Sequence, residues 1–517
     1  MKKYFLIFFF SIIAIFIHGY QFAYSDQEIF IPYILRSADQ SLFPQDQIFN
    51  QSSAHLSLFY PLAGFMTKLL DIETIFFTGY LIFQFSFFVA IYRLSKVLLS
   101  DQYLAYFSLL PFMLPKFIGG TATQTFDLFF GYRSIGVVLL ILYLSFLIEK
   151  KYLKSGFLAV VALLFHPLSA IPGIFSIPAV FILNAKVKLL SLSKFIALLL
   201  VLFLIIVLIG QRNIISSLLL RDESWISIMK FRADYLFTST WKLSAWGAFF
   251  MYFVICVIFL NLLKKGVKKS VIIISSTAII IFLINTVLLE WIKLPGFAKP
   301  QLIRSIAPVA YMALSLSPLF LTYKDKILKT LGIVTFTFLC LNLFYYFSIS
   351  AILFIITFSI VKNKSTLVPS KHFVYLITAL ILSTYIILNY GAYLNLQSKI
   401  QFPKKENDWI NLQKWANQNT QKSATFLVPP KETGFRIFSH RPIVGDSKDG
   451  AVVIYNPQYA SYWSNLMKDL SNYEDLNEQE FSLLKKKYSF NYLITKTNQI
   501  VNLEIIYKNK SYILYKI

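Results

Sequence analysis

Apolar stretches alternate with short Lys-rich linkers along residues 1–391, and a polar segment follows the last stretch. Because a helix needs about 20 mostly apolar residues to cross a hydrocarbon core, this rhythm predicts about 13 membrane spans. We place them near residues 4–20, 73–94, 103–118, 134–149, 155–168, 169–185, 194–211, 246–263, 270–290, 302–322, 329–345, 346–361 and 372–391. The pattern therefore predicts an all-α polytopic membrane domain over residues 1–391.

The positive charges predict which linkers between the spans lie on the cytoplasmic side. With the N-terminus inside, the cytoplasmic linkers carry about twenty Lys and Arg residues against roughly three acids, as the positive-inside rule expects. These cations are Lys2, Lys3, Arg93, Lys96, Lys150, Lys151, Lys154, Lys186, Lys188, Lys194, Lys264, Lys265, Lys268, Lys269, Lys324, Lys326, Lys329, Lys362, Lys364 and Lys371. An odd number of spans puts the C-terminal segment outside. We expect a multi-pass protein of the inner (cytoplasmic) membrane, with a cytoplasmic N-terminus and an uncleaved first helix.

Two soluble parts interrupt or follow the spans. The segment 55–70 contains Pro61, Gly64 and Lys68, so we expect an interfacial helix there and a long first outer loop over residues 21–72. Residues 392–517 are polar and predict a small extracytoplasmic α/β domain. Its expected helix covers 409–417 behind an Asn407-Asp408 cap. Its expected strands lie at 425–428, 435–438, 452–455, 491–495, 503–507 and 511–516, the last two forming a hairpin.

Composition removes several classes of function. Net charge is +24, but the cations lie in linkers between spans and serve there as topology signals, so we expect a lipid bilayer and no nucleic acid as partner. The two cysteines, Cys256 and Cys340, both lie in apolar stretches and build neither a disulfide framework nor a thiolate metal site. The sequence contains no phosphate-binding Walker loop, dinucleotide motif or HExxH metal motif.

Acids gather in the first outer loop, at Asp26, Glu28, Asp39 and Asp46. Asp26 follows a span directly and is expected at the interface, where partial desolvation raises the pKa of a carboxylate and makes it a usable base. Such carboxylates also suit a divalent cation such as Mg²⁺ or Mn²⁺, with Asp26 and Glu28 as the ligands. A plain solvated loop, with acids kept away from the inner face, fits the same spacing.

Cations at outer helix ends form a second group, of which Arg133, Arg232 and Arg304 are the candidates for substrate binding. The guanidinium fork fits phosphate oxygens with two hydrogen bonds, so a lipid phosphate is a natural ligand at this depth. Anchoring to lipid headgroups explains a single Arg equally well. His166, at a helix break before Pro167, is a further candidate for binding substrate, although a lone His more often has a structural role.

The order of these parts resembles the GT-C superfamily of membrane glycosyltransferases. The stretches SDQEIFIP (25–32) and SLFPQD (41–46) are similar to the first loop of a bacterial GT-C-like branch. In the tail, WANQNT (415–420), ATFLVPP (424–430) and the Phe435-Arg436 to Arg441-Pro442 segment are similar to the start of the outer domain. This sequence has Asp-Gln-Glu where some branches have two adjacent acids.

The resemblance implies transfer of a sugar from a polyprenyl-phosphate donor to an extracytoplasmic glycan, lipid or protein acceptor. Carried over, Asp26 is the first choice for the base and Glu28 the second, while Asp46 matches the pattern as a substrate-binding residue. Two alternatives stay open: a non-catalytic GT-C-like protein that binds a glycan or lipid intermediate in envelope assembly, and a lipid or polysaccharide transporter. A transporter would show a polar path at mid-membrane or two similar halves, and the sequence shows neither.

Overall fold

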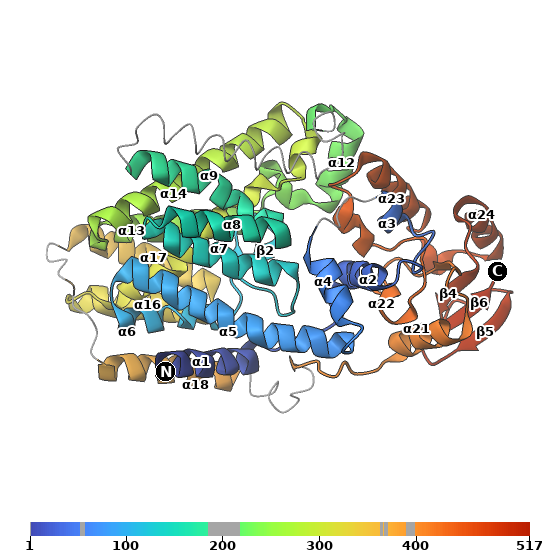
Figure 1. Ribbon diagram of the computed structural model, residues 1–517, viewed down its shortest axis with the longest axis horizontal. Helices are drawn as coiled ribbons and strands as arrows, with labels where there is room; N and C mark the ends of the chain where they lie inside the picture. The colour runs from blue at the N-terminus through green and yellow to red at the C-terminus, as the bar shows by residue number, and fades with distance from the viewer. Residues whose placement is uncertain (1, 52–56, 185–217, 362–365, 367–370, 389–398) are drawn as a thin grey trace.

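The apolar helices run roughly along the longest axis of the molecule, and the C-terminal domain covers one end of them (Figure 1). The structure is a computed structural model that describes residues 2–51, 57–184, 218–361, 366, 371–388 and 399–517. The C-terminus lies at the end farthest from the N-terminus, and the helices of the first loop lie between the two parts.

Within the described residues, four helical segments are long and apolar enough to cross a membrane: Ile72–Leu99, Leu243–Leu262, Lys265–Trp291 and Pro295–Leu321. Six further apolar helices are shorter: Tyr4–His18, Tyr132–Ile148, Tyr152–Phe165, Pro167–Leu183, Phe344–Ile360 and Leu376–Tyr385. The expectation of about 13 spans is therefore met only in part by the residues that the structure describes.

The helices of the apolar part have well-defined bounds. They are α1 (Lys2–His18), α5 (Ile72–Leu99), α7 (Tyr132–Ile148), α8 (Tyr152–Phe165), α9 (Pro167–Asn184), α13 (Leu243–Phe259), α14 (Lys265–Thr286), α15 (Ala307–Leu316), α16 (Lys326–Cys340), α17 (Phe344–Ile360) and α18 (Lys371–Leu388). The shorter α12 (Glu223–Arg232) lies next to the C-terminal domain (Figure 1).

The expected span 103–118 is wrong, because this stretch is not one helix. It divides into α6 (Gln102–Phe107), a 3-10 turn at Leu110–Met113 and the first strand of a two-stranded hairpin, β1 (Phe117–Ile118) with β2 (Thr123–Gln124). Pro111 and Pro115 explain the break, since proline has no N–H to donate and its ring clashes with the preceding turn. The expected span 194–211 lies outside the described residues.

The first loop folds into three short helices, α2 (Gln27–Ala38), α3 (Gln47–Gln51) and α4 (Phe59–Met66). Helix α4 takes the place of the expected interfacial helix and buries Phe59, Tyr60 and Ala63. Its other side exposes Leu62 and Phe65, an apolar face of the kind that suits a helix lying at a membrane surface.

The C-terminal domain contains a four-stranded sheet in the order β3-β4-β6-β5. Its strands are β3 (Phe426–Leu427), β4 (Tyr492–Lys496), β5 (Glu504–Lys508) and β6 (Tyr512–Lys516), with β3 parallel to β4 and the other pairs antiparallel. Successive residues of a strand point to opposite faces, so Leu493 packs in one cluster and Ile494 in another. The helices around the sheet are α21 (Asp408–Asn419), α22 (Arg436–Ser439), α23 (Pro457–Asp469) and α24 (Glu478–Tyr488).

Most local predictions for this domain are confirmed and two are wrong. Asn407 caps α21 by accepting from the N–H of Ile410 at 2.9 Å, and the C-terminal hairpin is present. The expected strand 435–438 is instead helix α22, and 452–455 lies at the end of a 3-10 turn. Both stretches pack against the first loop and the apolar helices, and this tertiary environment overrides a short apolar run.

The domain is not joined to the rest by its linker alone. The side chains of Ile437, Val453, Tyr459 and Trp463 belong to the same buried cluster as the first loop and the apolar helices. Trp225 of α12 is 1% exposed and donates from its indole N–H to the carbonyl of Val453 at 2.8 Å. This packing fixes the C-terminal domain against the first loop and the neighbouring helices.

Candidate functional site

Three carboxylates of the first loop each pair with a cation of the C-terminal domain. Asp26 pairs with Lys448 at 2.8 Å, Asp39 with Lys422 at 3.1 Å, and Asp46 with Arg436 at 2.7 Å. The partners lie about 400 positions apart in the sequence, so the acidic loop and the C-terminal domain occupy the same side of the molecule. That this shared side lies outside the cytoplasm stays a prediction of the charge pattern.

The Asp46 pair is the centre of a fully buried charge cluster. Arg436 donates from Nε and Nη2 to the two oxygens of Asp46 at 2.7 and 3.0 Å, and from Nη1 and Nη2 to those of Asp449 at 2.8 Å each. Asp46 also accepts from the backbone N–H of Ile443 at 3.1 Å, and Asp446 exchanges hydrogen bonds with Asp449 through backbone N–H groups. Three carboxylates surround one guanidinium here.

Burial sets the protonation of this cluster. It raises the pKa of Asp46, although Arg436 opposes the shift, and it raises the pKa of Asp446 well above the ordinary range, with Asp449 beside it adding to the effect. The Asp46 side chain is 1% exposed. A buried carboxylate with both oxygens engaged is suited to joining two parts of a protein, so the geometry favours an architectural role for Asp46 over direct contact with a substrate.

Asp26 has a different environment. It stands directly before α2 in the helical region, where its side chain makes no capping hydrogen bond, and it remains 61% exposed. The surrounding protein alone would raise the pKa of Asp26, but Lys448, Arg304 and Arg133 outweigh that effect and lower it. Asp26 is therefore an accessible and ionised carboxylate.

Glu28 lies in the first turn of α2, and its pKa is shifted in the opposite direction from that of Asp26. Burial raises its pKa, against the hydroxyl of Thr433 and the charges of Lys448 and Lys404. Its Cγ lies 3.3 Å from where a Cβ would stand on Gly434, which has φ +76°. Two neighbouring carboxylates whose pKa values move apart divide acid and base roles between them, and here Asp26 is the ionised member.

Arg304 is a cation of the apolar part that interacts electrostatically with Asp26. It lies on the 3-10 turn Leu302–Ile306, which follows Gln301 in the left-handed region at φ +44°. Its guanidinium carbon lies 5.6 Å from the ring centroid of Tyr235, and its Nε is buried without a hydrogen-bond partner. Among the described residues no carboxylate forms an ion pair with Arg304, so its charge is available to an anion.

Four tyrosines lie within electrostatic range of the Asp26 carboxylate: Tyr60, Tyr132, Tyr235 and Tyr455. The hydroxyl of Tyr235 donates to Gln301 Oε1 at 3.1 Å, and Gln301 Nε2 donates to the hydroxyl of Tyr455 at 3.4 Å. Asp26, Arg304, Gln301 and these four tyrosines are called the Asp26 cluster below. Its residues come from the first loop, the start of α7, the 3-10 turns Asp234–Leu236 and Leu302–Ile306 with the residue before the latter, and the C-terminal domain.

Arg133 and His166 lie in the same region but are already engaged. Arg133 pairs with Asp127 at 2.5 Å and its side chain is 15% exposed. His166 is buried, shares a 2.7 Å hydrogen bond between its Nδ1 and Ser169 Oγ, and packs on the ring of Tyr132 at 5.2 Å. Both residues interact electrostatically with this cluster, and Arg304 is better placed than either to contact an anionic ligand.

Arg232 lies at the border of the cluster. It ends α12, interacts with Tyr235, and places its Nε 2.7 Å from the position of a Cβ on Gly450. The same Cβ would meet the ring of Trp463 at 2.5 Å, so only glycine fits between these two side chains. Arg232 therefore packs on the C-terminal domain and contributes charge to the edge of the site.

The carboxylates do not fit a divalent metal. One oxygen of Asp26 accepts from the ammonium of Lys448, and Glu28 offers one further carboxylate. No group of three or more His, Cys, Asp or Glu side chains suited to a metal occurs in the part of the chain that the structure describes.

Sequence patterns did not reveal Lys448, Tyr455, Tyr60 or Gln301 as site residues. Each belongs to a different segment and only the fold brings them together, and no spacing rule connects Lys448 with Asp26. The available signals were indirect: Tyr235 lies in an aromatic loop, and Gln301 directly precedes the outer end of an apolar stretch.

Comparison with known proteins adds the following. A family model described as a domain of unknown function (DUF6798) matches residues 407–470, the part of the C-terminal domain that supplies Arg436, Lys448 and Tyr455. No curated protein matches the chain. Among solved structures, the apo oligosaccharyltransferase of Archaeoglobus fulgidus is similar at 11% identity, over 95% of this chain and 69% of that one, with a TM-score of 0.44. A likeness at that TM-score carries no further argument about this chain.

Proposed function

We propose that this protein is a membrane glycosyltransferase that moves a sugar from a polyprenyl-phosphate donor to an extracytoplasmic acceptor. One observation carries the proposal. An accessible ionised carboxylate, Asp26, interacts electrostatically with Arg304, which forms no ion pair with a described carboxylate, and both lie among tyrosines. Glycosyl transfer needs a base for the acceptor and a cation for the leaving phosphate, and these two side chains meet both needs.

In the proposed reaction the acceptor hydroxyl loses its proton to Asp26 as its oxygen attacks the anomeric carbon. The bond between that carbon and the donor phosphate oxygen breaks, and its electron pair stays on the phosphate. Arg304 stabilises the charge that develops there, because a fixed donor aimed at developing charge acts more strongly in the transition state than in the ground state. Tyr235 and Gln301 hold Arg304 and Tyr455 around the reacting groups.

The pair between Asp26 and Lys448 gives Lys448 a part in this scheme. While Lys448 donates to Asp26, it lowers the basicity of that carboxylate. An incoming phosphate offers Lys448 a second anionic partner and would draw it away from Asp26. Asp26 then becomes the stronger base at the moment the donor is bound.

The test is transfer activity of purified Asp26→Asn with a polyprenyl-phosphate sugar donor. Loss of a general base costs about 10²- to 10⁴-fold in rate. Asp39→Asn is the matched control, because it removes another first-loop carboxylate that pairs with the C-terminal domain but lies outside the Asp26 cluster. Unchanged turnover in the folded Asp26→Asn variant would remove Asp26 from the mechanism.

A second function is favoured by one observation: all three paired acids of the loop are occupied by cations of the C-terminal domain. That arrangement also suits a non-catalytic protein that binds a lipid-linked glycan. Such a protein would bind the donor with an affinity that depends on Arg304, and neither wild type nor variant would turn it over.

A further inference from the structure

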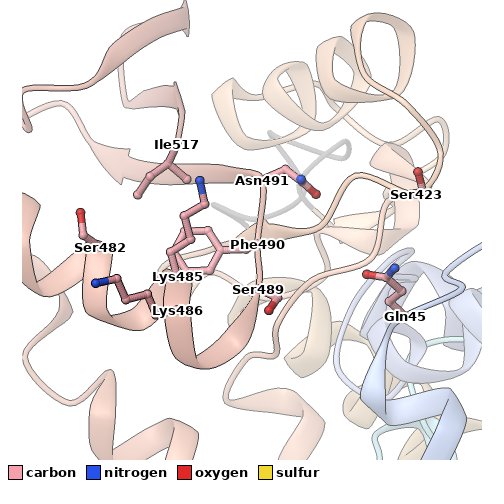
Figure 2. A pocket seen from close by; sticks show the side chains of 9 residues that line it. All are labelled: Gln45, Ser423, Ser482, Lys485, Lys486, Ser489, Phe490, Asn491 and Ile517. Atoms are coloured by element: carbon pink, nitrogen blue, oxygen red, sulfur yellow. The ribbon is translucent and has the colours of Figure 1, made fainter.

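A groove lies on the C-terminal domain where it meets the first loop, away from the Asp26 cluster. It has a volume of about 770 Å³, within the range of small-molecule sites, and Gln45 of the first loop is among its lining residues. Figure 2 shows Gln45 and Ser423 on one side, with Ser482, Lys485 and Lys486 on the other. Two separate parts of the chain thus form one hollow.

The side chains that line this groove are neutral or cationic, and none is a carboxylate. Gln45, Ser423, Ser482 and Asn491 are exposed, and their amides and hydroxyls can donate hydrogen bonds. Asn491 accepts from the backbone N–H of Thr425 through its Oδ1 at 2.9 Å, and no described residue accepts from its amide nitrogen. The groove therefore presents an excess of donors.

Two ammonium groups add positive charge. Lys485, Lys486 and Lys487 all lie in the last turn of α24, where cations ordinarily complement the helix dipole. Lys487 is neutralised by Asp469 at 2.6 Å, whereas within the described part of the chain no carboxylate pairs with Lys485 or Lys486. Lys485 and Lys486 therefore leave a net positive charge on the wall of the groove. The helix dipole of α24 alone does not explain why both charges lie on this wall.

The location of the groove argues against a lipid headgroup as its ligand. Helix α24 and the sheet lie at the end of the molecule farthest from α1, beyond the first-loop helices (Figure 1). A bilayer that surrounded the apolar helices would therefore lie away from that end. The polar lining also lacks an exposed aromatic platform, since Phe490 is 1% exposed, so recognition depends on hydrogen bonds and charge.

We propose that this groove binds an anionic glycan, a short saccharide that carries carboxylate or phosphate groups, through Lys485, Lys486 and the neighbouring amides and hydroxyls. The groove lies outside the Asp26 cluster, so this proposal holds whether or not Asp26 catalyses sugar transfer. As a surface site based on charge, it is expected to weaken as added salt screens the ammonium groups.

The experiment measures binding of trigalacturonate to the full chain in detergent, with the neutral trisaccharide maltotriose as the comparison. We expect trigalacturonate to bind at least tenfold more tightly than maltotriose, and we expect its binding to weaken at high salt. The double variant Lys485→Ala/Lys486→Ala should bind trigalacturonate at least tenfold more weakly than the wild-type chain does. Lys487→Ala, which removes the paired lysine of the same helical turn, should leave binding within twofold of wild type.

Three results would overturn the proposal. They are the absence of trigalacturonate binding to the wild-type chain, equal binding of the neutral trisaccharide, and equal loss in the Lys487→Ala control. A salt-sensitive interaction with phosphatidylglycerol vesicles that depends on Lys485 and Lys486, without trigalacturonate binding, would assign the groove to a lipid surface instead. Sugar-transfer activity is also measured on the Lys485→Ala/Lys486→Ala variant. Loss of binding in the groove is thereby distinguished from loss of the transfer reaction that the Asp26→Asn variant tests.

Discussion

Replacing Arg436 by Met tests whether the buried charge cluster holds the C-terminal domain on the first loop. The change removes four hydrogen bonds of 2.7–3.0 Å and leaves Asp46 and Asp449 buried without their cation. Removing one partner of a buried ion pair costs about 3–5 kcal/mol because an uncompensated charge stays behind. Since a tenfold change in an equilibrium corresponds to about 1.4 kcal/mol, the docked state should become about a hundred- to a few-thousand-fold less favoured.

Lys422→Met is the matched control. Lys422 pairs with Asp39 and joins the same two parts of the chain, but the two side chains are 60% and 45% exposed. Exposed pairs contribute about 0–1 kcal/mol, so this variant should stay close to wild type. Hydrogen–deuterium exchange of backbone amides in residues 436–452 and in α2 measures the local opening free energy of both variants on one scale.

The pH dependence gives the cluster a second signature. In Arg436→Met, Asp46 and Asp446 lose the cation that opposed the effect of burial, so the pKa of each in the folded state rises further above its value in the unfolded chain. A group with a raised folded-state pKa contributes stability at low pH and loses it as the pH rises. The deficit of the variant should therefore shrink as the solution is acidified from neutral pH. Equal protection in Arg436→Met and Lys422→Met, or a deficit that grows on acidification, would refute this account of the cluster.

Three further predictions concern the Asp26 cluster and its sidedness. Lys448→Met removes the main influence that lowers the pKa of Asp26, so the acidic limb of the pH–rate profile should move to higher pH, whereas a limb that stays in place would show that Lys448 does not control the base. Arg304→Gln should lower kcat by about 10²- to 10³-fold with a smaller effect on KM, as steady-state kinetics can measure, because the guanidinium acts on charge that develops in the transition state. A cysteine placed at the exposed Ser471 should react with a membrane-impermeant maleimide in intact cells, since both native cysteines are buried; labelling only after lysis would reverse the proposed topology.

Local patterns predicted those parts of the fold that depend on neighbours in sequence. The cap at Asn407, the C-terminal hairpin and most apolar helices follow from hydrogen-bonding residues and periodicity within a few positions. The stretches 435–438 and 452–455 have the composition of strands but pack against the first loop, and that environment decides their conformation. A short apolar run does not carry this information.

The candidate site was predictable in its residue types more than in its geometry. Asp26 and Arg304 stood out because acids and cations at the outer ends of spans need a reason to be there, and the structure brings them together. The same argument selected Asp46, whose partner Arg436 lies 390 positions away. Without that partner in view, a buried connecting carboxylate and a substrate ligand look alike in the sequence.

The long separation between Asp46 and Arg436 also matters while the chain is being made. At about 5–20 residues per second, the ribosome needs about 20–80 s to travel the 390 positions between them. Throughout that interval Asp46 lacks its cation, and α2 lacks its contacts with α22. The contact between the first loop and the C-terminal domain that Arg436 makes can therefore form only after most of the chain has been synthesised.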